Sequence, residues 1–360
     1  MEVTFSVMIP EIFLHKKSMR KKRVRKPITI LDVAKAAGVS VSTVSRVLND
    51  KDDVSLETYE KVQKVIEDLG FTSSLAARGM RSHRTRIIGL VMPDVSSLYC
   101  VEIMQGVNRV IMNSEYDLLV YTNGDINKYS TANHDSRFVM LLNGSIADGV
   151  IVVTPKATDF HTTAPLVIID PNHEEPDYPA ILSTNREGAQ AAMAYLTGLG
   201  HRRIGHITGR LDLWSACQRL QGYKDGLAAA GIPVDDRLIQ FGDYTTETAL
   251  KCARTLLAME DRPTAIFAAN DMSAFGVYQA AEEAGLCVPQ DVSIIGFDNL
   301  QAAAYQNPPL TTINQSISEM GAIATETILT LLKGETPEEK LKILPTQLIV
   351  RDSCQPPGAR

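Results

Sequence analysis

Cysteine is scarce in this chain, whose 360 residues include only five, all scattered. No two of them form a C-x-x-C pair, so the sequence predicts neither a zinc site nor a disulfide framework, and free thiols fit a reducing cytosol. No apolar run reaches the length that spans a membrane. The first 14 residues are mildly apolar, but positive charges follow them, which is the wrong order for a secretory signal. We therefore expect a cytoplasmic protein without membrane contact.

Recognisable catalytic strings are missing as well. The sequence holds no G-x-x-x-x-G-K-[ST] phosphate loop, no H-E-x-x-H zinc motif and no G-x-S-x-G nucleophile elbow. The seven histidines are scattered, and His201 and His206, which flank an apolar run, are interpreted as structural. We expect that the protein is not an enzyme, that it has no catalytic or metal-binding residues, and that it needs no cofactor.

Net charge is small and unevenly placed. A composition of 44% hydrophobic and 22% charged residues is that of a soluble protein with about two or three domains. The first 86 residues hold 17 lysines and arginines against 10 acidic residues, whereas the rest holds 19 against 32. A basic end on an acidic body is expected where one end attracts DNA phosphates. We interpret the basic run 16–26 as part of a disordered tail, the alternative being an arm that adds phosphate contacts.

The segment 28–50 predicts two short helices joined by a tight turn. Thr29 stands three residues before Asp32, a capping-box pattern that opens a helix. Gly38 supplies the turn, where a side chain would crowd the change of direction, and Ser40 can cap the second helix. The apolar face of the first helix consists of Ile30, Val33, Ala34 and Ala37.

The second helix has an apolar face and a polar face. Its inward residues are Val44, Val47 and Leu48, and its outward residues are Val41, Ser42, Thr43, Ser45, Arg46 and Asn49. A helix-turn-helix sets such a second helix into the DNA major groove; the alternative is an ordinary helical hairpin with a solvated face. A third helix over about 55–69 would pack on the first two through Tyr59, Val62, Val65, Ile66 and Leu69.

From Arg86 onward, apolar runs alternate with helical segments. The runs are IIGLVMP, DLLVYT, GVIVVT, LVIID, RIGHIT, AIFAAN and VSIIGF. Continuous Val/Ile/Leu runs of this kind indicate parallel strands covered on both faces by helices. About ten strands are too many for one doubly wound sheet, so we expect two lobes. The chain would cross between them near 181–185 and again near 310–315.

Polar residues stand at the ends of several predicted strands. Asp170, Asn270 and Asp298 each end an apolar run, Arg219 opens the helix after another, and Gln315 lies at the second crossing. Ligands of open α/β sheets bind beyond the carboxyl ends of strands. Carboxylates, amides and a guanidinium suit a sugar, whose hydroxyls both donate and accept hydrogen bonds. Alternatively, Asp298 caps a helix and Arg219 pairs with an acid.

The string GVSVSTVSRVLN closely resembles the DNA-binding headpiece of the LacI/GalR (lactose/galactose repressor) family. Motifs of the body resemble the same family, namely LGHRRIGHITG, RLQGYKDGL, RPTAIFAANDMSAFG, VPQDVSIIGFDN and PPLTTINQ. The resemblance covers residues 28–352. It implies an N-terminal all-α helix-turn-helix headpiece and an α/β bilobal body like the periplasmic sugar-binding proteins, with two doubly wound parallel-sheet lobes.

The resemblance also implies roles in DNA binding. We expect Val41, Ser42 and Arg46 to read bases, and phosphates to be held by Thr43, Ser45 and Asn49, with Thr29, Ser40 and Arg78 in the same surface. Residues 73–82 correspond to the hinge helix of the family, and Met80 would wedge between base pairs in the minor groove. This chain has Ser73-Ser74 where the family commonly has Pro-Asn, and Met80 where it has Leu; the alternative for Met80 is a packed linker residue.

For the body, the resemblance implies an effector site. By motif, the effector contacts of the family correspond to Asp170, Arg219, Asn270, Asp298 and Gln315. Tyr99 and Tyr244 stand at positions where the family often has an aromatic residue, and Trp214 lies in the loop just before Arg219. Cys100 stands where related proteins often have an aromatic ring, which puts the stacking geometry in doubt. A pentose, hexose, disaccharide or purine remains open, with a carbohydrate favoured.

We therefore predict a ligand-responsive repressor that binds a pseudo-palindromic operator as a homodimer. The alternatives are a solute-binding receptor for sugar uptake, which leaves the headpiece unexplained, and an architectural DNA binder whose site has lost its ligand. The direction of the effector response stays open. The predicted parts are a basic extension at 1–27, the DNA-binding domain at 28–72, hinge helix and linker at 73–86, an effector-binding and dimerisation domain at 87–352, and a tail at 353–360 without a heptad pattern.

Overall fold

The computed structural model describes residues 28–48, 53–71, 84–122, 132–143 and 146–358. The chain divides into two compact units, one ending at Ser74 and the other beginning at Leu75. The predicted extension, Asn49 and nearly all of the predicted hinge, including Arg78 and Met80, lie outside the described residues. No helix in the described ranges is long and apolar enough to cross a membrane.

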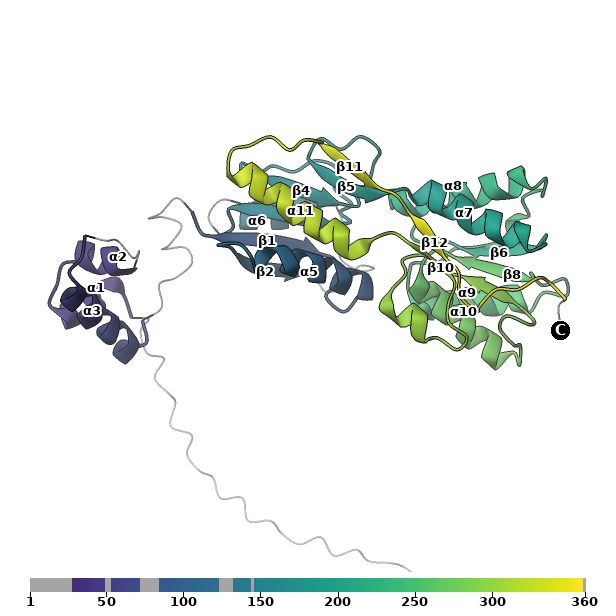
Figure 1. Cartoon of the computed structure of the whole chain (residues 1–360), viewed down its shortest axis with the longest axis horizontal. Helices are drawn as coiled ribbons and strands as arrows, with labels where there is room; N and C mark the ends of the chain where they lie inside the picture. The colour runs from purple at the N-terminus through teal and green to yellow at the C-terminus, as the bar shows by residue number, and fades with distance from the viewer. Residues whose placement is uncertain (1–27, 49–52, 72–83, 123–131, 144–145, 359–360) are drawn as a thin grey trace, which may run out of the picture. The chain divides into compact units, whose positions relative to one another are not determined.

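The N-terminal unit is a three-helix headpiece made of α1 (Ile30–Ala37), α2 (Val41–Leu48) and α3 (Leu56–Leu69) (Figure 1). Gly38 ends α1 with a φ of +64°, a left-handed conformation that glycine adopts without a Cβ penalty. The buried core consists of Val33, Ala34, Ala37, Val44, Val47 and Val62. The inward helix faces predicted from the apolar spacing are therefore confirmed, whereas Val41, which was predicted to face outward, packs in part against this core.

The first lobe of the body is a six-stranded, all-parallel sheet in the order β11-β5-β4-β3-β1-β2. The strands are β1 (Ile87–Met92), β2 (Asp117–Thr122), β3 (Gly149–Val153), β4 (Leu166–Ile169), β5 (Ala180–Ser183) and β11 (Leu341–Leu344). Alternate residues of each strand belong to opposite faces. One face packs against α5 (Leu98–Ile111) and α11 (Ile317–Leu332), and the other against α6 (Ala132–Leu142).

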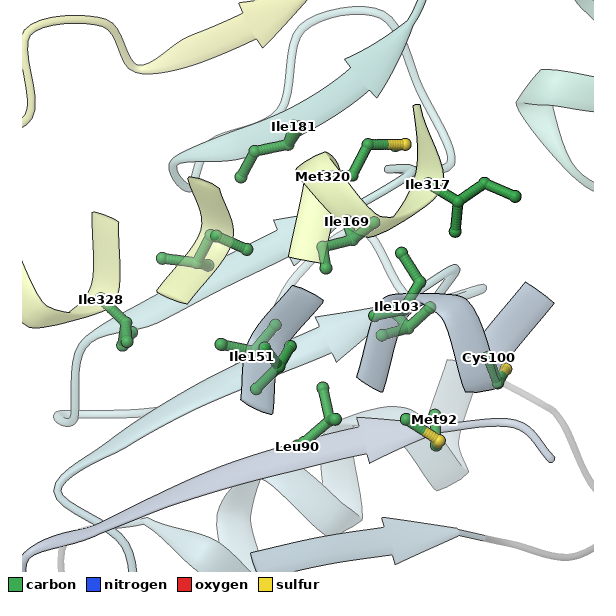
Figure 2. Close-up of a cluster of buried hydrophobic side chains, with 14 of the residues drawn as sticks. Leu90, Met92, Cys100, Ile103, Ile151, Ile169, Ile181, Ile317, Met320 and Ile328 are labelled. Carbon is green, nitrogen blue, oxygen red and sulfur yellow. The ribbon is translucent and has the colours of Figure 1, made fainter. Parts of the chain in front are cut away.

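Figure 2 shows the first of these two faces. Leu90 and Met92 of β1, Ile151 of β3 and Ile169 of β4 meet side chains from α5 and α11. Helices thus cover a sheet of near-continuous apolar strands, as parallel strands require.

The second lobe is a four-stranded parallel sheet in the order β7-β6-β8-β9. Its strands are β6 (Ile204–Ile207), β7 (Ile239–Gln240), β8 (Ala265–Ala268) and β9 (Ser293–Ile295). Helices α7 (Asn185–Gly198) and α8 (Trp214–Ala229) cover one face, and α9 (Thr246–Leu257) and α10 (Asp271–Glu283) cover the other. Two short 3₁₀ helices complete it, η1 (Asp236–Leu238) and η2 (Gln301–Tyr305). The predicted two-lobed α/β architecture is confirmed.

The chain passes between the lobes three times, once more than predicted. The first crossing joins β5 to α7, and the second joins β10 (Thr312–Asn314) to α11. The third joins β11 to β12 (Gln347–Ile349), which pairs antiparallel with β10. The hydroxyls of Thr184 and Thr346, 2.9 Å apart, tie the first crossing to the third. Strand β11 did not stand out in the sequence because it is short, a lysine interrupts its apolar residues, and these residues are partly exposed.

The C-terminal segment also packs on the second lobe. The buried Ser353 hydroxyl accepts a hydrogen bond from the Thr311 amide (2.8 Å) and donates to the Ile294 carbonyl (2.5 Å). The Gln355 carbonyl lies 2.9 Å from His201 Nε2. The packing of the body thus continues past Asp352, where we placed the boundary from the sequence.

Candidate functional site

The N-terminal end of α2 presents a group of hydroxyls. Ser40 Oγ accepts a hydrogen bond from the Thr43 amide at 3.1 Å and so caps the helix, as predicted. The same oxygen lies 2.7 Å from Ser42 Oγ and 2.8 Å from Thr43 Oγ1. Hydroxyls and a helix N-terminus at one exposed point can donate hydrogen bonds to phosphate or to base edges.

Arg46 projects from α2 with 57% of its side chain exposed, and its Nε lies 3.4 Å from a carboxylate oxygen of Asp53. An exposed ion pair of this kind contributes at most about 1 kcal/mol, so DNA can displace Asp53 at little cost. Val41 is half-buried against the headpiece core, so only part of its side chain faces outward.

Thr29 stabilises the start of α1. Its amide and hydroxyl donate to one carboxylate oxygen of Asp32 at 2.8 and 2.7 Å, and these bonds lower the pKa of Asp32. Thr29 remains exposed at the helix end, where a phosphate could also be bound.

In the body, Arg219 of α8 is the centre of a buried polar cluster. Its guanidinium donates to the Ala269 carbonyl (2.6 Å), Asn185 Oδ1 (2.8 Å) and Gln315 Oε1 (3.3 Å). Nη1 lies 3.6 Å from Asp298 Oδ1. The Phe297 ring stacks beneath it, with the guanidinium carbon 3.8 Å from the ring centroid, within range of a cation–π interaction. The cation is thus held from several sides.

Asp298 and Gln315 join this cluster to the crossings. Gln315 Nε2 donates to Asp298 Oδ1 at 2.5 Å, and Gln315 Oε1 accepts from the Ser183 hydroxyl at 3.0 Å. Ser183 ends β5 just before the first crossing, and Gln315 lies in the second. Burial raises the pKa of Asp298 to about 7, although Arg219 and Gln315 favour its charged form. A titrating carboxyl therefore lies where the two lobes meet.

Asp170 follows β4 of the first lobe and contacts the second lobe. Its Oδ2 accepts a hydrogen bond from the hydroxyl of Ser215, in the first turn of α8, at 3.0 Å. Burial raises the pKa of Asp170, with Arg219 acting in the opposite direction. Asp170, Tyr244 and Asp298 all have positive φ angles, of 55°, 73° and 122°. Backbone strain at non-glycine residues concentrates at binding sites.

Two tyrosine hydroxyls have no hydrogen-bond partner among the described residues. Tyr99 of α5 and Tyr244 before α9 both bury this group. Burial raises the pKa of Tyr244 to about 12 and that of Tyr99 well above its usual value, and the charges of Asp170 and Asp298 act on both. A buried polar group without a partner is rare and calls for a water or a ligand.

The remaining predicted residues have other contacts. Asn270 caps α10 by accepting from the Ser273 amide at 2.9 Å, and its amide donates to the Tyr244 carbonyl at 3.2 Å. Trp214 is half-buried, and its backbone N–H donates to Asn172 Oδ1 at 2.8 Å. The structure thus brings Asp170, Arg219, Asp298, Gln315 and the two tyrosines together, whereas Asn270 supports Tyr244.

Sequence reasoning missed several members of the cluster. These are Asn185, Ser183, Ser215 and Phe297. A signal existed for some of them, because Ser183 and Asn185 lie within the predicted first crossing and Phe297 directly precedes Asp298. For Ser215 the contact depends on how the lobes meet, which no local pattern holds.

Known protein families match both parts of the chain. Residues 29–74 match the lacI family of bacterial regulatory proteins, and residues 193–354 match a periplasmic binding protein-like domain. The chain is 32% identical over 334 residues to the HTH-type transcriptional repressor PurR of Vibrio atlanticus (91% of this chain, 98% of that protein). It is 34% identical over 330 residues to the ribose operon repressor of Haemophilus influenzae (90% and 98%).

Among solved structures, the lac repressor dimer bound to operator and the anti-inducer ONPF matches with a TM-score of 0.76 and 25% identity, over 92% of this chain and 100% of that one. The chain belongs to the lacI family of bacterial regulatory proteins. It is a DNA-binding transcription regulator with a periplasmic-binding-protein-like body. An uptake receptor is not favoured, because such a protein has no use for the headpiece.

Proposed function

We propose that this protein is a repressor that binds a pseudo-palindromic operator as a homodimer and is controlled by a carbohydrate bound between the two lobes of its body. The buried cluster of Asp170, Arg219, Asp298 and Gln315, with two unpartnered tyrosine hydroxyls beside it, carries this proposal. Its place of action is the cytoplasm, where the DNA is, and the proposal includes no catalytic step.

The chemistry of the cluster favours a neutral, hydroxyl-rich effector. Carboxylates accept hydrogen bonds, the guanidinium donates them, and phenol hydroxyls do both, which matches the dual character of sugar hydroxyls. Two buried carboxylates, Asp170 and Asp298, face one guanidinium. A phosphorylated sugar would bring its own charge into a buried site whose one guanidinium already faces two carboxyl groups, and burying a charge without a partner is costly.

For DNA, we propose that Val41, Ser42 and Arg46 read bases, while Thr43, Ser45 and Asn49 hold phosphates together with Thr29, Ser40 and Arg78. Met80 would enter the minor groove at the operator centre, with 73–86 as hinge and linker and 28–72 as the DNA-binding domain. The exposure of Ser42 and Arg46 supports the reading face. A lac repressor dimer bound to operator is among the similar structures, which supports a dimer.

Effector binding would act through the angle between the lobes. The cluster joins residues of both lobes and of two crossings, so a ligand that replaces contacts such as Ser215–Asp170 changes how the lobes meet. By linkage, the operator must alter effector affinity by the same factor as the effector alters operator affinity.

A thermal-shift screen of the full chain against sugars, sugar phosphates and nucleobases tests the proposal. A ligand at a hundredfold its Kd stabilises the folded body by about 2.7 kcal/mol, which is a shift of several degrees. We expect neutral sugars to shift the melting temperature and phosphorylated sugars to leave it unchanged. A panel without any stabilising sugar would count against a carbohydrate effector.

Replacing Asp298 by Ala tests the site itself. We expect Asp298→Ala to bind the operator as well as the wild type but to lose the effector response, because the headpiece is untouched while the cluster loses its carboxylate. Operator titrations with and without the screened sugar measure both properties. Lys251→Met, which removes an exposed charge from α9, is the control, and an unchanged response in Asp298→Ala would remove this residue from the site.

A further inference from the structure

A salt bridge joins the lobes at the edge of the buried cluster. Asp212 lies in the second lobe, two residues before the start of α8, and its Oδ2 is 2.8 Å from Nζ of Lys156, which follows β3 in the first lobe. The same oxygen lies 2.7 Å from Arg210 Nη2, within its own loop. Lys156 and Arg210 are 23% and 10% exposed, and Asp212 is 49% exposed. Solvent therefore screens the pair only in part.

Uncharged contacts flank this pair. Asn172, which follows β4 in the first lobe, donates from its amide to the Asp212 carbonyl at 3.1 Å and accepts from the Trp214 amide at 2.8 Å. With the Ser215–Asp170 bond, the segment 212–215 of the second lobe is thus bound to two loops of the first. These hydrogen bonds fix the distance at which Lys156 meets Asp212.

We propose that Lys156 and Asp212 form an electrostatic latch that sets the ratio of closed to open lobes before any effector is bound. Arg210 is its positioning residue, because it belongs to the same loop as Asp212 and keeps the carboxylate in place when the lobes separate. Opening then breaks the Lys156–Asp212 pair together with the flanking hydrogen bonds of Asn172 and Ser215, and it leaves Asp212 paired with Arg210. The change is therefore reversible, and its ionic part is sensitive to salt.

Asp212 stays ionised across the physiological pH range. Hydrogen bonds from Arg210 and then Lys156 hold the pKa of Asp212 well below its usual range, against the effect of partial burial. The latch therefore responds to ionic strength and not to pH.

If the proposed function holds, the latch also affects the affinity of the protein for its effector. The apparent affinity for an effector is scaled by the fraction of the protein in the binding-competent state. Loss of a partly exposed ion pair is expected to change the ratio of closed to open lobes by about two- to fivefold. Weakening the latch is expected to change the effector affinity by this factor, although no residue of the buried cluster is altered.

The test uses the fluorescence of Trp214, the only tryptophan of the chain. In the effector-free full chain we expect acrylamide, a neutral quencher, to reach Trp214 more readily as salt rises from about 0.05 to about 0.5 M, because screening loosens the latch. In Lys156→Met we expect acrylamide to reach Trp214 readily already at low salt, with no further change as salt rises. Lys156→Arg keeps the charge and is expected to behave like the wild type.

The matched control is Lys251→Met, which removes one lysine from an exposed pair with Glu247 within α9. The latch proposal is contradicted if quenching of Trp214 in the wild type does not change with salt. It is also contradicted if quenching in Lys156→Met is the same as in Lys251→Met. Neither result needs an effector, so the carbohydrate proposal would stand. A working latch in a protein that no sugar stabilises would instead overturn the effector proposal alone.

Discussion

At the scale of single residues, Arg219 shows how the body tolerates a buried cation. One carboxylate at 3.6 Å, three hydrogen-bond acceptors and an aromatic face replace the water that the guanidinium loses. Removing one partner of a buried pair leaves an uncompensated charge, which commonly costs about 3–5 kcal/mol. Asp298 nevertheless has a raised pKa, because burial disfavours its charged form more than Arg219 and Gln315 favour it.

Asp298 makes the stability of the body depend on pH. Its folded pKa of about 7 lies above the usual 3.8, so the folded protein retains a proton that the unfolded chain releases. We expect Asp298 to lower the free energy of unfolding as pH rises from 5 to 8, and Asp298→Asn to remove this contribution. Asp170 and Asp271 act in the same direction, so a part of the slope remains. His201 and His206, whose pKa values are lowered by burial, act in the opposite direction over the lower part of this range, so the comparison of the variant with the wild type is what tests Asp298.

Urea denaturation at pH 5 and 8 measures this effect. Asp225→Asn is the matched control, because Arg186 holds the pKa of Asp225 at about 2, outside the tested range. If Asp298→Asn keeps the slope of the wild type, Asp298 is not the titrating group.

Arg46 is the residue on which sequence discrimination depends in our proposal. We expect Arg46→Ala to lose about 1–3 kcal/mol of preference for the operator, because a bidentate contact to a guanine edge contributes that much. Weak, salt-sensitive binding to any DNA should persist. A gel-shift competition between operator and unrelated DNA measures the preference, and a variant that still discriminates as the wild type does would exclude Arg46 from readout.

At the scale of elements, two glycines allow α5 and α11 to pack closely against each other. A Cβ at Gly106 would lie 1.7 Å from the Ser318 carbonyl oxygen, and one at Gly321 would lie 2.3 Å from the Ile103 carbonyl oxygen. Both obstacles are backbone, which cannot rotate away. The absence of a side chain at these two positions thus sets the distance between the helices.

We expect Gly106→Ala to destabilise the body by about 1–3 kcal/mol or more, because overpacking forces the backbone apart. Gly198→Ala serves as the control, since nothing lies within 4 Å of a Cβ there and alanine favours a helix. Urea denaturation followed by circular dichroism compares the two. Equal stabilities for the two variants would show that α5 and α11 can separate without cost.

At the scale of the whole molecule, the headpiece and the body have separate cores. The described headpiece buries six apolar residues, whereas four larger clusters fill the two faces of each sheet of the body. A small core provides only marginal stability. The two units are therefore expected to respond to different ligands.

Calorimetry of the full chain tests this separation. We expect a lower transition for the headpiece, raised by operator DNA, and a higher one for the body, raised by the effector, because each ligand stabilises only the unit that binds it. The direct readout is the shift of each transition with each ligand added alone. A single transition that moves as a whole with either ligand would contradict two independent units.

Local pattern was enough to predict much of this protein. The three headpiece helices follow from apolar spacing, the cap at Ser40 and the turn at Gly38, all of which depend on neighbours within a few residues. The main strands follow from apolar runs, and Asp170 and Asp298 stand out because they end such runs. The tertiary structure alone decided the third crossing, the contacts of Arg219 with Asn185 and Phe297, the two unpartnered tyrosines and the Lys156–Asp212 pair. Each of these depends on segments that lie far apart in the chain and meet only through tertiary packing, which no short stretch of sequence records.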